Sequence, residues 1–265
     1  MKNDRIPWLL SETNYGIIKE QQFEVAVLPI GATEPHNLHL PYSTDTFCVS
    51  RIAERICHAA WERGAKVVLL PTIPFGTQTN QREFPLAINV NPSTMNRLLV
   101  DIIESLVHCN IRKIVLLNGH GGNEFKGFLR ESYGKIDAKI FVCDWWRCFN
   151  DKYKEIFEEP DDHGGEMETS VMLALAPELV AQNEAGQFHA DNGAVQPTRF
   201  AAVNRGWVSI SRPWHLLTSN TGSGNPHKAT AAKGQEAMDL AVERLAPFLV
   251  ELSASPLDAT FPFEQ

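Results

Sequence analysis

The segment Phe23-Glu-Val-Ala-Val-Leu-Pro-Ile30 is an apolar run that leads directly into Gly31-Ala-Thr-Glu34-Pro-His36-Asn-Leu-His39-Leu-Pro41-Tyr-Ser-Thr-Asp45. A run of this length and composition is typical of a strand buried within a sheet. The polar segment after it contains two carboxylates and two imidazoles, and both groups are ligands of divalent cations. The pattern predicts a buried strand that ends at a metal site.

Apolar runs and amphipathic segments alternate along the rest of the chain. We expect strands at residues 25–30, 66–70, 113–117 and 139–143. We expect helices at residues 45–63, 93–109, 124–133, 166–175 and 227–252, the first of them with Ser43 or Thr44 as its N-cap. Regular alternation of strand and helix favours parallel strands joined by crossover helices, so the predicted fold class is α/β.

The length and composition fit one domain. The chain has 265 residues, of which 43% are hydrophobic, and this is enough for one substantial core. There is no internal repeat, low-complexity tract or clear linker, so we expect a single domain over residues 1–265. Residues 182–225 are the least regular part, and we expect them to cover the site or to join a neighbouring subunit.

The net charge, the apolar runs and the cysteines indicate which partners and which cellular compartment to expect. The net charge is −8 and no basic run offsets it, which argues against a nucleic-acid partner. The segment from Met1 to Trp8 lacks the apolar stretch of a signal peptide, and no apolar run is long enough to span a bilayer. The five cysteines form no CxxC pair. We therefore expect a reduced, cytoplasmic protein without a membrane partner.

A second group of polar residues follows the strand expected at 113–117. His120 lies in Asn118-Gly-His-Gly-Gly-Asn123, where the glycines let the backbone approach a ligand and either asparagine is a candidate to orient the imidazole. In a parallel sheet ligands bind beyond the carboxyl ends of the strands. If the two strands are neighbours, Glu34, His36 and His120 converge there. Taken singly, Glu34 is typical of a solvated loop residue, and Asp45 is typical of a helix cap.

The third polar cluster is Asp161-Asp162-His163-Gly-Gly-Glu166-Met-Glu168-Thr-Ser170. A polar loop that caps a helix accounts for the two aspartates but less well for His163 and Glu168. Glu168 lies among apolar residues of the expected helix, so we expect it to be partly buried. A buried carboxylate needs a partner, and a cation is one candidate.

Together these motifs resemble those of the creatininase (creatinine amidohydrolase) family. The similar segments are Glu34-Pro-His36 with His39-Leu-Pro41 and Thr44-Asp45, Asn118-Gly-His-Gly-Gly-Asn123, His163-Gly-Gly-Glu-Met-Glu-Thr-Ser170, and Gly224-Asn-Pro226 with Ala229-Thr-Ala-Ala-Lys-Gly234. The resemblance implies a three-layer sandwich with a central, mostly parallel sheet flanked by helices. It also implies a homo-oligomer, commonly a hexamer.

The resemblance further implies a centre with two divalent metal ions, most often Zn²⁺, with Mn²⁺ or Fe²⁺ as alternatives. Carried over residue by residue, Glu34, Asp45 and His120 hold one metal. His36 and Asp45 hold the second, so that Asp45 bridges the two ions. The implied reaction is hydrolysis of a C–N amide bond of a small molecule, a cyclic amide or a formamide, by a metal-activated water. His163 is then the catalytic residue that passes a proton to the departing nitrogen.

Two departures from the family pattern bear on the site. Creatininase has a glutamate two positions after the histidine that matches His120, and here this position is Gly122. We expect Glu168 to supply the missing carboxylate, with Glu166 as the alternative. The loop at residues 74–85 also departs, at Gln78 and Gln81, so the resemblance does not extend to creatinine as the substrate.

The divergent loop leaves the function open in two ways. Within the family, deformylation of opened purine or pyrimidine rings, or a peptidase-like activity, is an alternative. A centre with one bound metal rather than two, which carries out another hydrolysis such as deformylation, is also an alternative. A metal-stabilised scaffold or small-molecule sensor on the same fold, without turnover, is the non-catalytic alternative. Trp145, Trp146 and Trp214 are candidates for pocket walls, and core or interface packing explains them equally well.

Overall fold

The structure is a computed structural model that describes residues 6–263. Residues 1–5 lie outside this range. They are most of the segment from Met1 to Trp8, for which we predict that there is no signal peptide. Among the described helices, none combines the length and the apolar composition that crossing a bilayer requires. All five cysteines are free thiols.

Four parallel strands form the central sheet, in the order β2-β1-β3-β4. They are β2 (Val67–Leu69), β1 (Val25–Ile30), β3 (Lys113–Asn118) and β4 (Lys139–Asp144). Every residue of the two central strands is buried, whereas β4 is an edge strand with partly exposed residues. The four strands predicted from the apolar runs are confirmed, with ends that differ by one residue at most.

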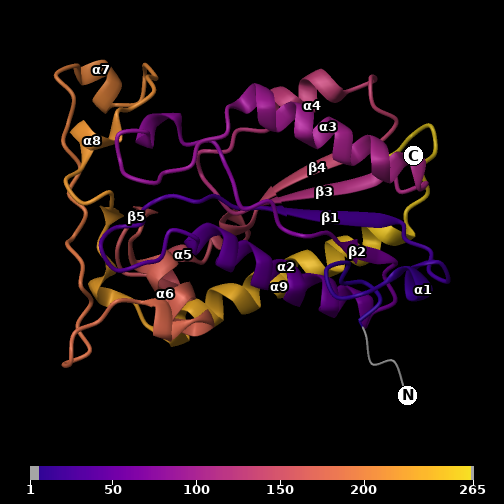
Figure 1. Ribbon diagram of the computed structural model, residues 1–265, viewed down its shortest axis with the longest axis horizontal. Helices are drawn as coiled ribbons and strands as arrows, with labels where there is room; N and C mark the ends of the chain where they lie inside the picture. Colours follow the sequence, from indigo (N-terminus) through magenta and orange to yellow (C-terminus); the bar gives the residue numbers. More distant parts are fainter. Residues whose placement is uncertain (1–5, 264–265) are drawn as a thin grey trace.

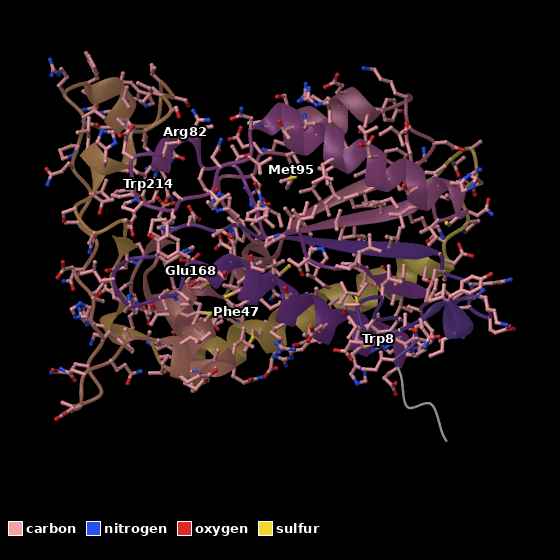
Figure 2. All side chains as sticks on the ribbon, viewed as in Figure 1. Trp8, Phe47, Arg82, Met95, Glu168 and Trp214 are labelled. Atoms are coloured by element: carbon pink, nitrogen blue, oxygen red, sulfur yellow. The ribbon has the colours of Figure 1, made fainter. Side chains whose placement is uncertain are left out.

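Successive residues of the central strands enter opposite cores, as the period of two in a strand requires. In β1, Val27 belongs to the core that contains Trp8, and Leu28 belongs to the core that contains Met95. Figure 2 shows Met95 on one side of the sheet and Trp8 on the other. The two cores explain why the strands read as continuous apolar runs.

Helices cover both faces of the sheet and complete the three-layer sandwich (Figure 1). One face carries α3 (Pro92–His108) and α4 (Lys126–Ser132), and the other carries α2 (Thr44–Trp61) and α9 (Ala231–Ala254), with α6 (Glu166–Leu175) packed against α9. The helix predictions hold within a few residues. The last helix begins later than expected, because Pro226–Lys228 forms a separate 3-10 turn before the N-cap Thr230. Ser43 occupies the N-cap position of α2 but its side chain makes no capping hydrogen bond.

The remaining elements are short. They are the helices α1 (Tyr15–Ile18), α5 (Tyr153–Ile156), α7 (Ala201–Asn204) and α8 (Trp214–Leu217), the 3-10 turns η1 (Thr79–Gln81), η2 (Trp145–Phe149), η3 (Pro177–Leu179) and η4 (Pro226–Lys228), and the strands β5 (Asp161–His163) and β6 (Ser223–Gly224). Residues 182–225, which include α7 and α8, form an irregular arm beyond the carboxyl ends of the sheet strands (Figure 1). The arm returns to the body where β6 pairs antiparallel with β5.

The strand order determines where the site forms. The chain runs from β1 outward to β2 on one side, and then places β3 and β4 on the other side of β1. The crevice beyond β1 and β3 is therefore the point where the direction of winding changes, and ligands bind at such points in α/β sheets. Ile30 of β1 pairs with Asn118 of β3, so the segments that carry Glu34 and His120 leave the sheet side by side.

Candidate metal centre

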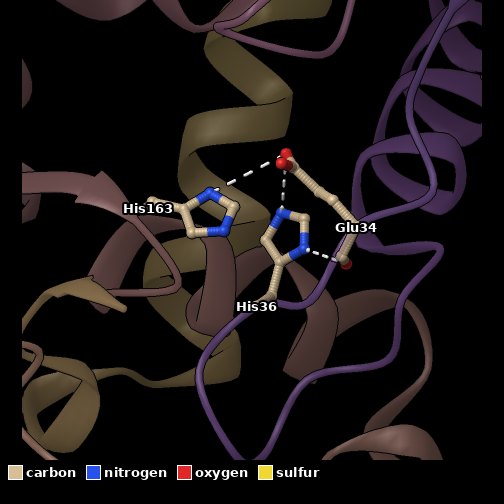
Figure 3. A group of neighbouring side chains, drawn as sticks. All are labelled: Glu34, His36 and His163. Atoms are coloured by element: carbon tan, nitrogen blue, oxygen red, sulfur yellow. Dashed lines mark hydrogen bonds and ion pairs between the residues drawn. The ribbon is translucent and has the colours of Figure 1, made fainter. Parts of the chain in front are cut away.

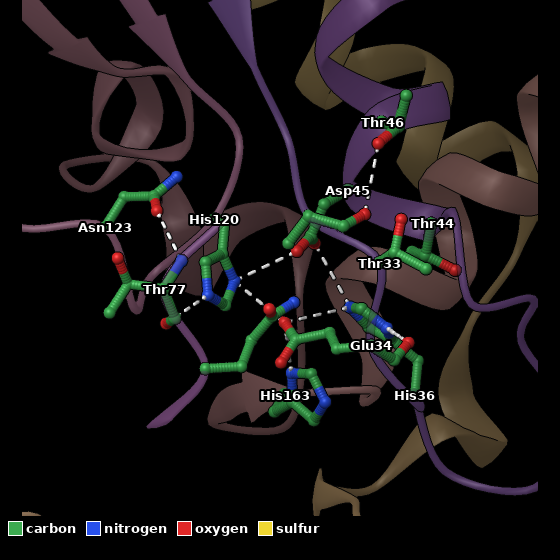
Figure 4. A network of polar contacts seen from close by, with 12 residues as sticks. Thr33, Glu34, His36, Thr44, Asp45, Thr46, Thr77, His120, Asn123 and His163 are labelled. Atoms are coloured by element: carbon green, nitrogen blue, oxygen red, sulfur yellow. Dashed lines mark hydrogen bonds and ion pairs between the residues drawn. The ribbon is translucent and has the colours of Figure 1, made fainter. Parts of the chain in front are cut away.

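Six side chains from four parts of the chain gather beyond the ends of β1 and β3. Figure 4 shows five of them, Glu34, His36, Asp45, His120 and His163. Their potential ligand atoms lie within 4.8 Å of one another in three groups, which are Glu34 with Asp45 and His120, His36 with Asp45 and Glu168, and Glu34 with His36 and His163. The first two groups are the sets expected for the two metals. The structure thus brings together every residue that the sequence singled out for the site, and their role as ligands stays a prediction.

Asp45 has the geometry of a bridge between the two groups. Its Oδ1 lies 3.1 Å from Nε2 of His36, and its Oδ2 lies 3.0 Å from Nδ1 of His120. It sits in the first turn of α2, where the helix dipole favours a carboxylate. An alanine at Gly31 would place its Cβ within 2.8 Å of Thr46 atoms, so the glycine lets the start of α2 approach the end of β1.

Glu34 is the common neighbour of the imidazoles. Its Oε1 lies 2.8 Å from Nδ1 of His120 and 3.9 Å from both Nε2 of His36 and Nδ1 of His163 (Figure 3). The side chain is fully buried, which excludes the solvated loop residue that Glu34 alone suggested. Nε2 of Gln81 donates a hydrogen bond to its other oxygen.

Each of the three imidazoles is oriented by a backbone carbonyl. Nδ1 of His36 lies 3.0 Å from the Glu34 carbonyl, Nε2 of His120 lies 3.1 Å from that of Thr77, and Nε2 of His163 lies 2.8 Å from that of Pro35. A carbonyl only accepts, so these nitrogens carry the ring hydrogens. The opposite nitrogens face the carboxylates, and they present lone pairs as metal-ligating histidines do once a cation displaces their protons.

The loop around His120 is closed by amide side chains. Asn118 accepts hydrogen bonds from the His120 backbone N–H and from Nδ2 of Asn123. Asn123 in turn accepts from the backbone N–H of Thr77, whose carbonyl receives the His120 ring hydrogen. Both asparagines thus help to orient His120, Asn118 through the backbone and Asn123 through Thr77.

The acids and imidazoles lie close together, and this shifts their pKa values. Burial alone would lower the pKa of His36, but the carboxylates of Asp45 and Glu168 raise it to about 10. Burial would likewise lower the pKa of His120, which Glu34 and Asp45 raise well above its usual range. Burial would raise the pKa of Asp45, but His36 and His120 hold it below its usual range. Without a cation, the protons on these imidazoles hold the cluster together.

The residues fit a pair of cations by their donor set. Oε1 of Glu34 and Oδ2 of Asp45 are buried, and the group that faces both of them is Nδ1 of His120, which can donate to them only when it is protonated. A cation that replaces this proton would take the nitrogen and both oxygens as its ligands. Imidazole nitrogens and carboxylate oxygens are the ligands that zinc and manganese accept.

Two glutamates of α6 were candidates for the missing carboxylate, and their surroundings separate them. Oε1 of Glu168 lies 3.8 Å from Nε2 of His36. Glu166 points away, because it pairs with Lys233 and accepts the backbone N–H groups of Glu158 and Glu159. The geometry therefore favours Glu168, the expected residue, over the alternative Glu166.

The glycine at position 122 has a steric cause. A Cβ there would lie 2.4 Å from Nε2 of His120 and 2.4 Å from the Thr77 carbonyl oxygen. Any side chain would thus break the hydrogen bond that orients the imidazole. Glu168 approaches the cluster from α6, on another part of the chain.

The other residues of the motifs have structural roles or lie at the margin of the site. His39 hydrogen-bonds Thr169 at 2.8 Å and belongs to none of the three groups. Trp145 is buried in a core, and Trp146 packs against the same core. Trp214 of the arm packs edge-on against His163, with ring centroids 5.0 Å apart. Sequence reasoning missed Thr77, whose role resides in its backbone carbonyl and leaves no signal in residue type.

Comparison with known proteins shows which family and which relatives the chain is similar to. It matches the model of the creatininase family, described as creatinine amidohydrolase, over residues 11–249. It is similar to the mycofactocin precursor peptide peptidase of Mycobacterium tuberculosis, with 30% identity over 214 residues, 79% of this chain and 78% of the relative. It is also similar to the creatinine amidohydrolase of Pseudomonas putida, with 35% identity over 180 residues, 59% of this chain and 66% of the relative.

Solved structures agree with the fold. A crystal structure of a suggested creatinine amidohydrolase from Bacteroides fragilis superposes with a TM-score of 0.86 at 39% identity, covering 94% of this chain and 98% of the other. A manganese form and a zinc form of creatininase share the fold at 24% identity, with TM-scores of 0.70 and 0.72. The family match over nearly the whole chain and these likenesses agree with the motifs, and the chain belongs to the creatininase family.

Proposed function

We propose that the protein is a metal-dependent amidohydrolase that cleaves a C–N amide bond with two divalent cations, Zn²⁺ or Mn²⁺. The observation that carries the proposal is the set of three imidazoles that donate outward to backbone carbonyls and face buried carboxylates inward. Glu34, Asp45 and His120 would hold one cation. His36, Asp45 and Glu168 would hold the other.

The cations supply the activation: when bound, they lower the pKa of water and polarise a carbonyl. The groups of the protein itself orient the metal ligands and transfer protons. The carbonyl of Thr77 fixes the ring of His120, and the Glu34 carbonyl fixes the ring of His36, so that neither ligand can rotate away. Burial of Glu34 and Asp45 keeps bulk water from competing for their oxygens.

His163 is the proposed proton carrier. Its Nε2 donates to the Pro35 carbonyl, so Nδ1 is the basic atom, and it faces Glu34. Nδ1 takes a proton from the attacking water as the new C–O bond forms. It gives this proton to the departing nitrogen as the C–N bond breaks, and the products are a carboxylic acid, which loses its proton to solvent, and an amine. Trp214 and His36 pack against the His163 ring and limit its rotation.

The substrate class is the open part of the proposal. A cyclic amide or a formamide is the substrate we propose first, because the family description and the Pseudomonas putida relative are creatinine amidohydrolases. A peptide bond is the second candidate, since a relative with 30% identity is a precursor peptide peptidase. We further propose a cytoplasmic homo-oligomer, which size-exclusion chromatography with light scattering would test.

Metal analysis and a substrate panel test the proposal. Protein purified without added metal should contain about two Zn²⁺ or Mn²⁺ ions per chain by mass spectrometry of the elements. The panel would contain creatinine, hydantoin, N-formyl amino acids and short peptides, with and without prior treatment with a chelator. Hydrolysis that the chelator abolishes supports an amidohydrolase. A metal-loaded protein that hydrolyses none of them would favour the sensor or scaffold reading.

A further inference from the structure

The loop at residues 76–91 and the arm contain buried polar atoms without a partner. Gln78 is fully buried, and neither Oε1 nor Nε2 of its carboxamide makes a hydrogen bond. Oε1 of Gln81 and Nε1 of Trp214 are also buried and unpartnered. Together they offer two donors and two acceptors, and none of the three side chains is charged.

These side chains lie over the candidate metal centre. The residue before Gln78 accepts the ring hydrogen of His120, and Gln81 in the same turn donates to Glu34. Along this turn Thr79 and Arg82 are exposed while Gln78 and Gln81 are buried, so the glutamines point inward, to the side of His120 and Glu34.

The arm packs against the same turn and against the candidate centre. Its helix α8 packs against the turn Thr79–Gln81, and Trp214 at the start of α8 contacts the ring of His163. Figure 2 shows Trp214 next to Arg82, beyond the carboxyl ends of the strands. The free donor of Trp214 and the free carboxamide of Gln78 therefore come from two segments that pack against each other, although these segments are distant in the sequence.

An unpaired carboxamide in a protein interior is destabilising, because both its donor and its acceptor have lost their hydrogen bonds to water. Nearly all buried polar groups are paired, and an exception calls for an explanation. The backbone N–H of Gln78 is held by Asn89, so the residue is fixed while its side chain stays free. A ligand that completes the hydrogen bonds removes the cost.

We propose that Gln78, assisted by Trp214, recognises a neutral planar amide group on the substrate, and this rests on the proposed function. The adjacent donor and acceptor of a carboxamide pair in two parallel hydrogen bonds with a cis amide, which presents the complementary acceptor and donor. Trp214 supplies a further donor to a carbonyl of the same group. A substrate with a cyclic amide or imide edge fits this set, and one that presents only a charged group there leaves the carboxamide unpaired.

The test uses two imides that differ by one donor. Succinimide presents a cis amide edge, whereas N-methylsuccinimide has lost the N–H. Binding of each to the metal-loaded protein is measured by ligand-observed NMR. Wild type should bind succinimide about 10-fold more tightly than N-methylsuccinimide, which is the effect expected of one well-made hydrogen bond. Gln78→Met should lose this preference, while the exposed control Gln235→Met should retain it.

Metal content and thermal melting separate recognition from structure. Gln78→Met should keep its metals and melt at the wild-type temperature or above, because an unpaired buried amide has been removed. Gln78→Leu is the second variant, should methionine fail to pack. Equal binding of the two imides by wild type, no binding of succinimide, or a lower melting temperature in both variants would overturn the assignment. Selective binding of succinimide by a protein that hydrolyses no amide would remove only the proposed function.

Discussion

The candidate centre has two halves that are built by different means. The half at the sheet, Glu34, Asp45 and His120, comes from segments whose positions follow from strand pairing and from the start of α2. The half away from the sheet, His163 and Glu168, comes from β5 and α6, which reach the centre through packing on α9 and pairing with the arm. The sheet half is fixed by backbone geometry. The other half depends on tertiary contacts, so mutations should affect the two halves differently.

The largest effect is expected at Asp45, the residue that both groups share. Asp45→Ala removes a carboxylate that faces His36 on one oxygen and His120 on the other. We expect loss of both metals by elemental analysis and a fall in amide hydrolysis of about 10³-fold or more, since the Lewis-acid contribution is several kcal/mol. The exposed control Asp101→Ala should retain both ions. Two ions in Asp45→Ala would show that Asp45 does not bridge.

His163 tests whether the other half carries the proton. His163→Ala should keep both metals, because the ring belongs to neither ligand group proposed for them. It should lower kcat by about 10²–10⁴-fold, the usual contribution of a general acid–base group. The exposed His215→Ala on the arm is the matched control. Loss of metal in His163→Ala would instead make His163 a ligand.

The two glutamates of α6 give a sharper comparison within one helical turn. Glu168→Gln should reduce the metal content by about one ion per chain and leave the fold intact, because this carboxylate faces His36. Glu166→Gln should retain both ions but lower the free energy of unfolding by about 1–3 kcal/mol, since Lys233 and two backbone N–H groups lose a charged acceptor.

Elemental analysis of both variants measures their metal content, and urea unfolding measures their free energy of unfolding. If Glu166→Gln loses metal and Glu168→Gln does not, the assignment of the second site is reversed. Equal metal loss in both would mean that α6 as a whole, rather than one carboxylate, supports the centre.

The contrast between the halves also explains what the sequence could reveal. The strands, the convergence of Glu34 with His120 and the ligand groups followed from apolar runs and the family motifs. The strand β5 did not, because two aspartates and a histidine carry no apolar alternation. The sequence also favoured Glu168 over Glu166, and this stays a prediction; the feature that separates the two glutamates, the ion pair of Glu166 with Lys233, joins residues 67 positions apart. Likewise the need for Gly122 arises from the Thr77 carbonyl, which no residue pattern encodes.

The smallest expected effect concerns His39, which lies in the first polar segment yet outside the three groups. Burial, with help from His227, lowers the pKa of His39 to about 4, so its ring is neutral in the folded protein. In the unfolded chain a histidine titrates near its ordinary value of about 6.5. Between these two values the unfolded state binds more protons, and the stability falls as the pH falls from about 6.5 towards 4.

His39→Gln removes this titration and keeps a hydrogen-bonding group for Thr169. Chemical unfolding of metal-free protein at several pH values should therefore give a slope of stability against pH that is smaller in the variant, by up to about 1.4 kcal/mol per pH unit. The exposed His108→Gln should keep the wild-type slope. Because the metal-free state contains the same His36 and His120 in both proteins, their protonation cancels in the comparison. Identical slopes would mean that the His39 ring accepts a proton in the folded state, and that its environment beside Thr169 is more polar than its burial implies.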